Sequence, residues 1–131
     1  MPDYTLRVTV ADDLEAAEPR VRSALAEEGF GVLTELDVEQ TLRTKLGVEV
    51  GGYRVLGACN PGLAYRGLSA DPDLGALLPC NVVLRAAGEG HTDVLAVDPH
   101  AMMMMSDAAE LGAVADEARS RLERALARLA E

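Results

Sequence analysis

The sequence predicts an α+β fold in which helices pack on one face of a single antiparallel sheet. Several short segments alternate apolar and polar residues, which is the pattern of half-buried strands. Between them lie segments with helical spacing that begin at capping residues and end at glycines. The connections between neighbouring strands are short, which favours antiparallel pairing. The predicted order is strand, helix, strand, small helix, strand, helical insertion, two strands and helix.

The first predicted strand spans residues 4–10, where Tyr4, Leu6, Val8 and Val10 share one face. Asp12 and Glu15 have the spacing of a capping box, so a helix begins near Asp13 and ends at Gly29. Pro19 lies inside this helix and removes a hydrogen bond. Either the first turn is distorted or the regular helix starts near Glu18.

A second strand follows over residues 30–38, and a capping box then begins a short helix. The sequence predicts that Val38, Leu42 and Leu46 face inward on this helix and that Gly47 ends it. The third strand covers residues 53–59, after the flexible Gly51-Gly52 turn.

Three Asn/Asp-Pro pairs mark the starts of short helical turns in the second half of the chain. In each pair an N-cap residue precedes proline at the first helical position, where its missing N–H is not needed. The pairs are Asn60-Pro61, Asp71-Pro72 and Asp98-Pro99. Strands are predicted over residues 80–86 and 91–97, joined by a loop at 87–90. The final helix is capped by Asp107 and Glu110 and runs to about Leu129.

Composition bounds the class of protein. A chain of 131 residues is expected to form one domain over residues 1–131, without disulfides or a structural metal. The net charge of −10 argues against nucleic acid and anionic membranes as partners. The start has no secretory pattern and no apolar segment is long enough for a membrane span. Two cysteines in such a chain predict reduced thiols in the cytoplasm.

Two predicted strands are apolar on both faces. Val82, Val83 and Leu84 are consecutive, as are the apolar residues from Val94 to Val97. A sheet covered on one side only would alternate apolar and polar residues. A homodimer that covers the second face explains this pattern, and the short inserted helices are the alternative.

The candidate site is the corner where Cys59-Asn60 and Cys80-Asn81 meet, if the third and fourth strands are antiparallel neighbours. The candidate ligand-binding residues are Cys59, Asn60, Tyr65, Cys80, Asn81 and Asp98. Thiol and amide groups beside an apolar cleft suit a small ligand. We favour a binding role over an enzymatic one, and we assign no catalytic residue, cofactor or metal site.

Three other interpretations of the corner stay open. The cysteines could be small buried hydrophobes, with the asparagines acting as caps. Cys59 at a helix start, with Cys80, could serve thiol redox or sulfur-transfer chemistry. Cys59, Cys80, His100 and the run Met102 to Met105 are soft or borderline ligands that suit copper.

Several pieces of the chain, in order, resemble one known family. These are EGFGVLTE over residues 28–35, KLG over 45–47, GACNP over 57–61, LPCNV over 78–82 and VDP over 97–99. Together they are similar to the bacterial and archaeal family known as domain of unknown function 302. The resemblance implies a TATA-binding-protein-like fold, with a curved antiparallel sheet in the order strand, helix, four strands, helix. It also implies a dimer, and it carries over no function and no catalytic residue.

Overall fold

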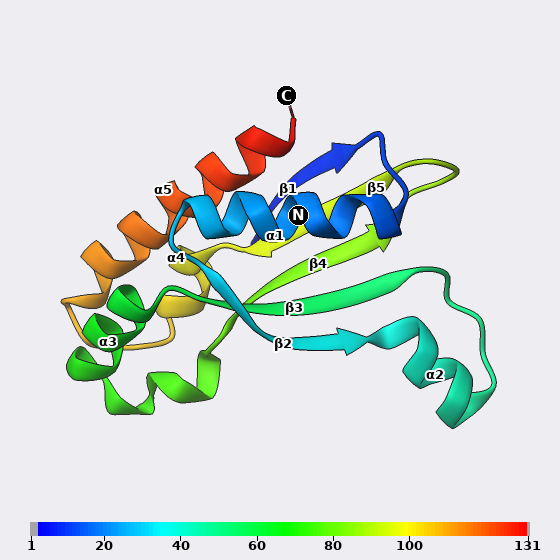
Figure 1. Cartoon of the computed structure of the whole chain (residues 1–131). Helices are drawn as coiled ribbons and strands as arrows, with labels where there is room; N and C mark the ends of the chain where they lie inside the picture. The colour runs from blue at the N-terminus through cyan, green and yellow to red at the C-terminus, as the bar shows by residue number, and fades with distance from the viewer. Residues whose placement is uncertain (1–2, 131) are drawn as a thin grey trace.

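The computed structural model describes residues 3–130 and contains a five-stranded antiparallel sheet beneath two long helices (Figure 1). The strands are β1 (Thr5–Val10), β2 (Gly31–Asp37), β3 (Tyr53–Cys59), β4 (Cys80–Ala86) and β5 (Thr92–Val97), in the spatial order β1-β5-β4-β3-β2. The long helices are α1 (Leu14–Glu27) and α5 (Leu111–Leu129). With the shorter helices set aside, the chain order is strand, helix, four strands, helix, which confirms the predicted α+β architecture.

The shorter helices begin where the proline pairs predicted. They are α3 (Pro61–Ala70), the 3-10 helix η1 (Pro72–Leu77) and α4 (Pro99–Met103). In each case the preceding side chain accepts a backbone N–H: Asn60 from Leu63 at 3.2 Å, Asp71 from Asp73 at 3.0 Å and Asp98 from His100 at 2.9 Å. Each pair therefore combines a cap with a residue that does not need its N–H.

The core has two parts. The larger part lies between the sheet and the two long helices, where Leu56, Val82, Leu84 and Val94 are completely buried. The second part lies where β3 stops and β4 starts, and α3, η1, α4 and the first half of α5 contribute to it. It contains Leu63, Leu74, Cys80, Met102, Met103, Leu111, Val114, Ala115 and Ala118. This second cluster surrounds the candidate corner.

The start of α1 differs from the prediction in its capping residue. Asp13, and not Asp12, accepts the N–H of Ala16 at 2.9 Å. Asp12 pairs instead with Arg20, and its carbonyl accepts the Thr92 hydroxyl at 2.9 Å. Pro19 lies in the second turn of a helix that begins at Leu14, so the alternative start near Glu18 is wrong.

The cap predicted for the last helix is also wrong. Helix α5 begins at Leu111, and the Glu110 side chain makes no capping hydrogen bond. The helix is held by its apolar side instead, because eight of its residues are buried. Within residues 3–130 no helix combines the length and the apolarity that a membrane crossing requires.

Helix α2 (Val38–Leu46) does not bury the stripe predicted for it. Its cap at Asp37 and its end at Gly47 are as expected, but none of its residues is buried and Leu46 is 69% exposed. The helix follows the edge strand β2 and projects from the end of the sheet (Figure 1). At this edge position Val38 and Leu42 are only half-buried, and Leu46 is exposed.

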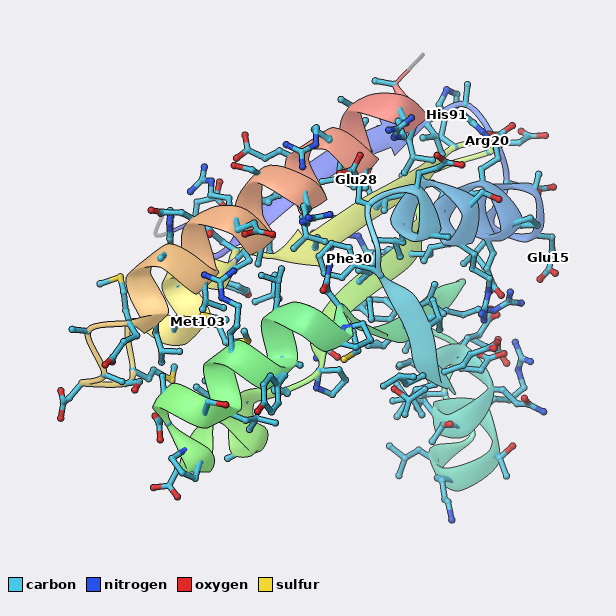
Figure 2. The ribbon with its side chains drawn as sticks, turned by 60° about the vertical axis from the view of Figure 1, so that its left-hand side comes forward. Glu15, Arg20, Glu28, Phe30, His91 and Met103 are labelled. Carbon is cyan, nitrogen blue, oxygen red and sulfur yellow. The ribbon has the colours of Figure 1, made fainter. Side chains whose placement is uncertain are left out.

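A tight turn ends α1, and its residue Glu28 contacts the other long helix, α5. Gly29 has a φ of 84°. Its N–H and that of Phe30 bond the carbonyls of Ala26 and Leu25 at 3.0 and 2.9 Å, which is a Schellman motif. The turn directs the buried Glu28 toward α5, as Figure 2 shows.

The Glu28 side chain is held by two arginines of α5. Its carboxylate accepts hydrogen bonds from Arg124 at 2.9 Å and Arg128 at 3.0 Å. The bonds from Arg128 and then Arg124 lower the pKa of Glu28 below its ordinary value of 4.5. At pH values above 4.5 the ionised carboxylate stabilises the fold. This stabilisation is lost as the pH falls through the depressed pKa of Glu28 in the folded state.

We therefore expect Glu28→Gln to lower the free energy of unfolding at neutral pH. The difference from the wild type should shrink as the pH falls below 4.5, because the wild-type carboxylate then becomes protonated. Urea denaturation across a pH series measures this effect. The exposed neighbour provides the control, and Glu27→Gln should change little at any pH. A constant difference across the series would contradict the role of the Glu28 charge.

Candidate functional site

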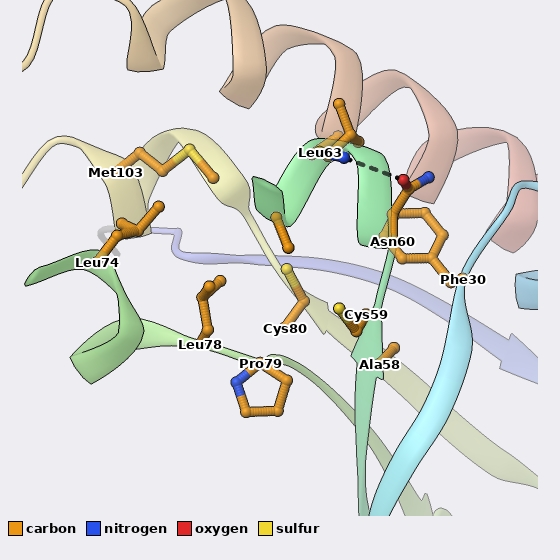
Figure 3. A pocket seen from close by; sticks show the side chains of 12 residues that line it. Phe30, Ala58, Cys59, Asn60, Leu63, Leu74, Leu78, Pro79, Cys80 and Met103 are labelled. Carbon is orange, nitrogen blue, oxygen red and sulfur yellow. Dashed lines mark hydrogen bonds between the residues drawn. The ribbon is translucent and has the colours of Figure 1, made fainter. Parts of the chain in front are cut away.

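A small apolar cavity lies where the end of β3 meets the start of β4 (Figure 3). Its free volume is about 30 Å³. A cavity of this size holds one or two heavy atoms, about the space of a water molecule. It is lined by Phe30, Ala58, Cys59, Asn60, Leu63, Ala64, Leu74, Leu78, Pro79, Cys80, Met103 and Ala118. No charged side chain is among these lining residues.

Both cysteines face this cavity. Strand pairing places Ala58 opposite Cys80, so Cys59 is one residue from direct register with Cys80. Alternation along β3 would turn Cys59 away from the Ala58 side, but the strand ends at Cys59 and both thiols line the same space. Figure 3 shows their sulfur atoms turned toward it.

The two thiols differ in their surroundings. Cys80 is 7% exposed, whereas Cys59 is half-buried, and both are free. Burial, and then the neighbouring Cys59, raise the pKa of Cys80 to about 11. Cys80 is therefore a neutral thiol at physiological pH, and Cys59 is the more accessible of the pair.

Both ends of the Asn60 side-chain amide make hydrogen bonds. Its Oδ1 accepts the Leu63 N–H at 3.2 Å, and its Nδ2 donates to the Glu28 carbonyl at 3.5 Å. That carbonyl also accepts Arg121 Nη1 at 3.1 Å. Asn60 thus fixes the first turn of α3 against the α1 end and α5, and it forms part of the cavity wall.

The structure places the other three candidate residues away from the cavity. Tyr65 is 75% exposed on the outer side of α3. Asn81 is exposed on β4, opposite Gly57. Asp98 is buried, where it caps α4 and pairs with Arg119 at 2.8 Å. Three of the six candidates, Cys59, Asn60 and Cys80, are therefore brought together.

The soft ligands considered for copper are likewise separated. Met103 lines the cavity, but Met104 and Met105 are exposed. His100 pairs with Asp116 of α5. Within residues 3–130, no group of three or more His, Cys, Asp or Glu side chains could hold a metal ion.

Much of the cavity wall was not identified from the sequence. Phe30, Leu63 and Leu74 come from separate parts of the chain and are recognisable in the sequence only as apolar residues, and Met103 was considered only as a soft metal ligand. The two elements that supply Leu63 and Leu74 pack closely because α3 has a glycine at the contact. A Cβ atom on Gly67 would lie 2.6 Å from Leu74 Cδ2.

The fold and this corner define a class: an α+β domain with a thiol-lined apolar cavity at the end of its sheet. The family model described as "Domain of unknown function DUF302" matches residues 6–129. The chain belongs to this family. No curated protein matches it.

A solved structure supports the same assignment. The chain is similar to the uncharacterized conserved protein DUF302 from Bacillus stearothermophilus, known from a crystal structure, with a TM-score of 0.88 and 28% sequence identity. The alignment covers 96% of this chain and 98% of that one. The whole arrangement of strands and helices is therefore shared.

The close contact at Gly67 leads to a prediction about two glycines in one helix. Gly67→Ala should destabilise the protein by about 1–3 kcal/mol, because the added methyl meets the buried Leu74. Gly62→Ala is the matched control, since its Cβ would be 3.7 Å from the nearest atom, Asn60 Oδ1. It should raise stability by up to about 1 kcal/mol through helix propensity. Chemical denaturation compares the two, and equal effects would contradict the packing argument.

Proposed function

We propose that this protein is a homodimeric binding protein that takes a small, uncharged ligand, or the uncharged end of a larger one, in the cavity beside Cys59 and Cys80. The observation that carries the proposal is the cavity wall, which consists of apolar side chains, two thiols and the Asn60 amide. Binding sites are typically apolar cavities with a few placed polar groups.

The wall restricts the chemistry of the ligand. Moving an uncharged polar group from water into an apolar cavity without a hydrogen-bond partner costs roughly 2–7 kcal/mol. An unpaired charged group costs more than this. Cys80 is protonated at neutral pH, so it presents an S–H and no charge. Neutral groups that pack against carbon and sulfur are therefore favoured over carboxylates and phosphates.

Small molecules that differ in charge test this directly. We expect xenon, a single neutral atom, to shift the methyl NMR signals of Leu63, Leu74 and Met103, because these side chains line the cavity. Chloride, a single charged atom, should leave the same signals unchanged. The variant Ala64→Val fills part of the cavity and should abolish the shifts, whereas Ser69→Val, exposed on the same helix, should keep them. If no neutral probe shifts these signals, the ligand proposal is wrong.

The homodimer is supported by the face of the sheet that α1 and α5 do not cover. Leu36, Val55, Val83 and Leu95 are paired neighbours in one row across β2, β3, β4 and β5. Their strand neighbours, such as Leu56, Leu84 and Val94, point to the helices and are buried. Alternation therefore places the row on the open face. In the row, Leu36 is 50% exposed whereas Leu95 is 8% exposed, and Leu46, Val48 and Val50 at and after the end of α2 are also exposed.

The charges on this face favour a second copy as the occupant. The chain has an excess of acidic residues and a net charge of −10, so most of its surface repels another copy. The open face carries Arg7, Arg85 and Asp93, and Arg85 pairs with Asp93 at 3.0 Å. Two acidic chains therefore meet with the least repulsion there.

The dimer is tested by a charge placed in the apolar row. We expect the wild type to sediment at twice the 13.8 kDa chain mass. Val83→Asp should weaken the dimer about 100-fold or more, because it buries an unpaired carboxylate. Ser120→Asp adds the same charge on the exposed side of α5 and should leave the dimer intact. A 13.8 kDa wild-type species at micromolar concentration would refute the dimer.

The net charge and the free thiols also bear on the partners and the compartment of the protein. Nucleic acid is a poor partner for a chain with a net charge of −10. Two free thiols fit a reducing compartment such as the cytoplasm. The likeness to the TATA-binding-protein fold remains a prediction about strand order and carries no nucleic-acid function.

A further inference from the structure

Cys59 and Cys80 have the placement that an internal disulfide requires. They lie on adjacent antiparallel strands, one residue from direct register, and both face one small cavity (Figure 3). They are close enough that Cys59 affects the ionisation of Cys80. Directly opposed Cα atoms lie roughly 4.5–5.5 Å apart, and a shift of one residue along a strand adds a rise of roughly 3.4 Å. The resulting separation of roughly 5.6–6.5 Å lies within the roughly 4.4–6.8 Å that disulfides span.

We propose that Cys59 and Cys80 form a reversible internal disulfide when the protein meets a low-molecular-weight disulfide, and that this bond acts as a redox switch on the cavity. The switch on ligand binding rests on the proposed function, whereas formation of the bond does not. The disulfide would replace the two S–H groups of the wall by one S–S bond.

The reaction proceeds in two exchanges. The Cys59 thiolate attacks one sulfur of the small disulfide, and that S–S bond breaks as a mixed disulfide forms on Cys59. The released thiolate takes up the proton that Cys59 lost. Cys80 then loses its proton and attacks Cys59 Sγ, and the second small thiolate leaves and is protonated. The two cysteines are oxidised by two electrons and the small disulfide is reduced to two thiols.

The roles of the two cysteines follow from their exposure. Cys59 is half-buried and can meet the small disulfide, while Cys80 is 7% exposed. Once Cys59 carries the mixed disulfide, its sulfur lies beside Cys80 within the cavity. Among the lining residues, Cys59 and Cys80 are the titratable ones, so the second exchange depends on the proton of Cys80.

The test is to treat the reduced full chain with glutathione disulfide, block the remaining thiols with N-ethylmaleimide and map the tryptic peptides. Cleavage at Arg54, Arg66 and Arg85 places Cys59 in peptide 55–66 and Cys80 in peptide 67–85. We expect the wild type to yield these two peptides joined, from a single chain that is lighter by two hydrogen atoms. Dithiothreitol should separate them.

Single variants resolve the order of events. Cys80→Ser should stop at glutathione bound to Cys59, and Cys59→Ser should keep a free Cys80 over the same time. In the wild type, closure of the internal bond should quicken about tenfold per pH unit below the Cys80 pKa of about 11, because only the thiolate attacks. The wild-type peptide map is decisive even where a variant does not fold.

Three outcomes would overturn the inference. These are glutathione on both cysteines of one chain, a bond between two chains, or free wild-type thiols under conditions that modify Cys59 in Cys80→Ser. The peptide map uses no ligand, so its result is separate from the probe experiment. If the bond forms and xenon shifts no signal in the reduced protein, only the ligand proposal and the switch on binding fail.

Discussion

The turn that ends α1 is the point on which the arrangement of the helices depends. Glu28 is 5% exposed, and its carboxylate is held by Arg124 and Arg128 while its carbonyl accepts Arg121 and Asn60. One residue thus connects α1, α5 and the start of α3. A carboxylate in this position requires all its partners, because a buried charge without them is strongly destabilising. The turn leaves no room for a side chain on Gly29, where a Cβ would lie 2.9 Å from Asn60 Nδ2.

Local chemistry made most of the fold predictable. Alternation identified the strands, and capping residues with glycine or proline located the helices to within a few residues. The errors have physical causes. Asp12 and Asp13 are adjacent, and both suit an N-cap. The choice between them depended on Arg20 and Thr92, which bind Asp12 and lie outside the capping segment. The stripe predicted for α2 is not buried, because the helix follows the edge strand, and an apolar pattern alone does not show whether a helix is covered.

Only the part of the candidate site that depends on the pairing of β3 with β4 was predictable from the sequence. The antiparallel pairing of β3 with β4 brings Cys59 to Cys80, on either side of the insertion that contains α3 and η1. Asn81 failed to join them because alternation on β4 turns it to the opposite face from Cys80. Asp98 is engaged by Arg119 from a helix much later in the chain. The cavity exists because α3, η1 and α4 meet there, and such packing has no local sequence signal.

The open face and the cavity share one residue, which links the two halves of the proposal. Pro79 lines the cavity beside Cys80, and its ring also lies 2.8 Å from where a Cβ on Gly57 would stand. Gly57 belongs to the open face, next in alternation to Val55. Because packed interiors transmit small displacements, a second copy bound to the open face as proposed would constrain one wall of the cavity through Pro79. In the proposed dimer, the contact between the chains and the shape of the cavity would therefore depend on each other through Pro79.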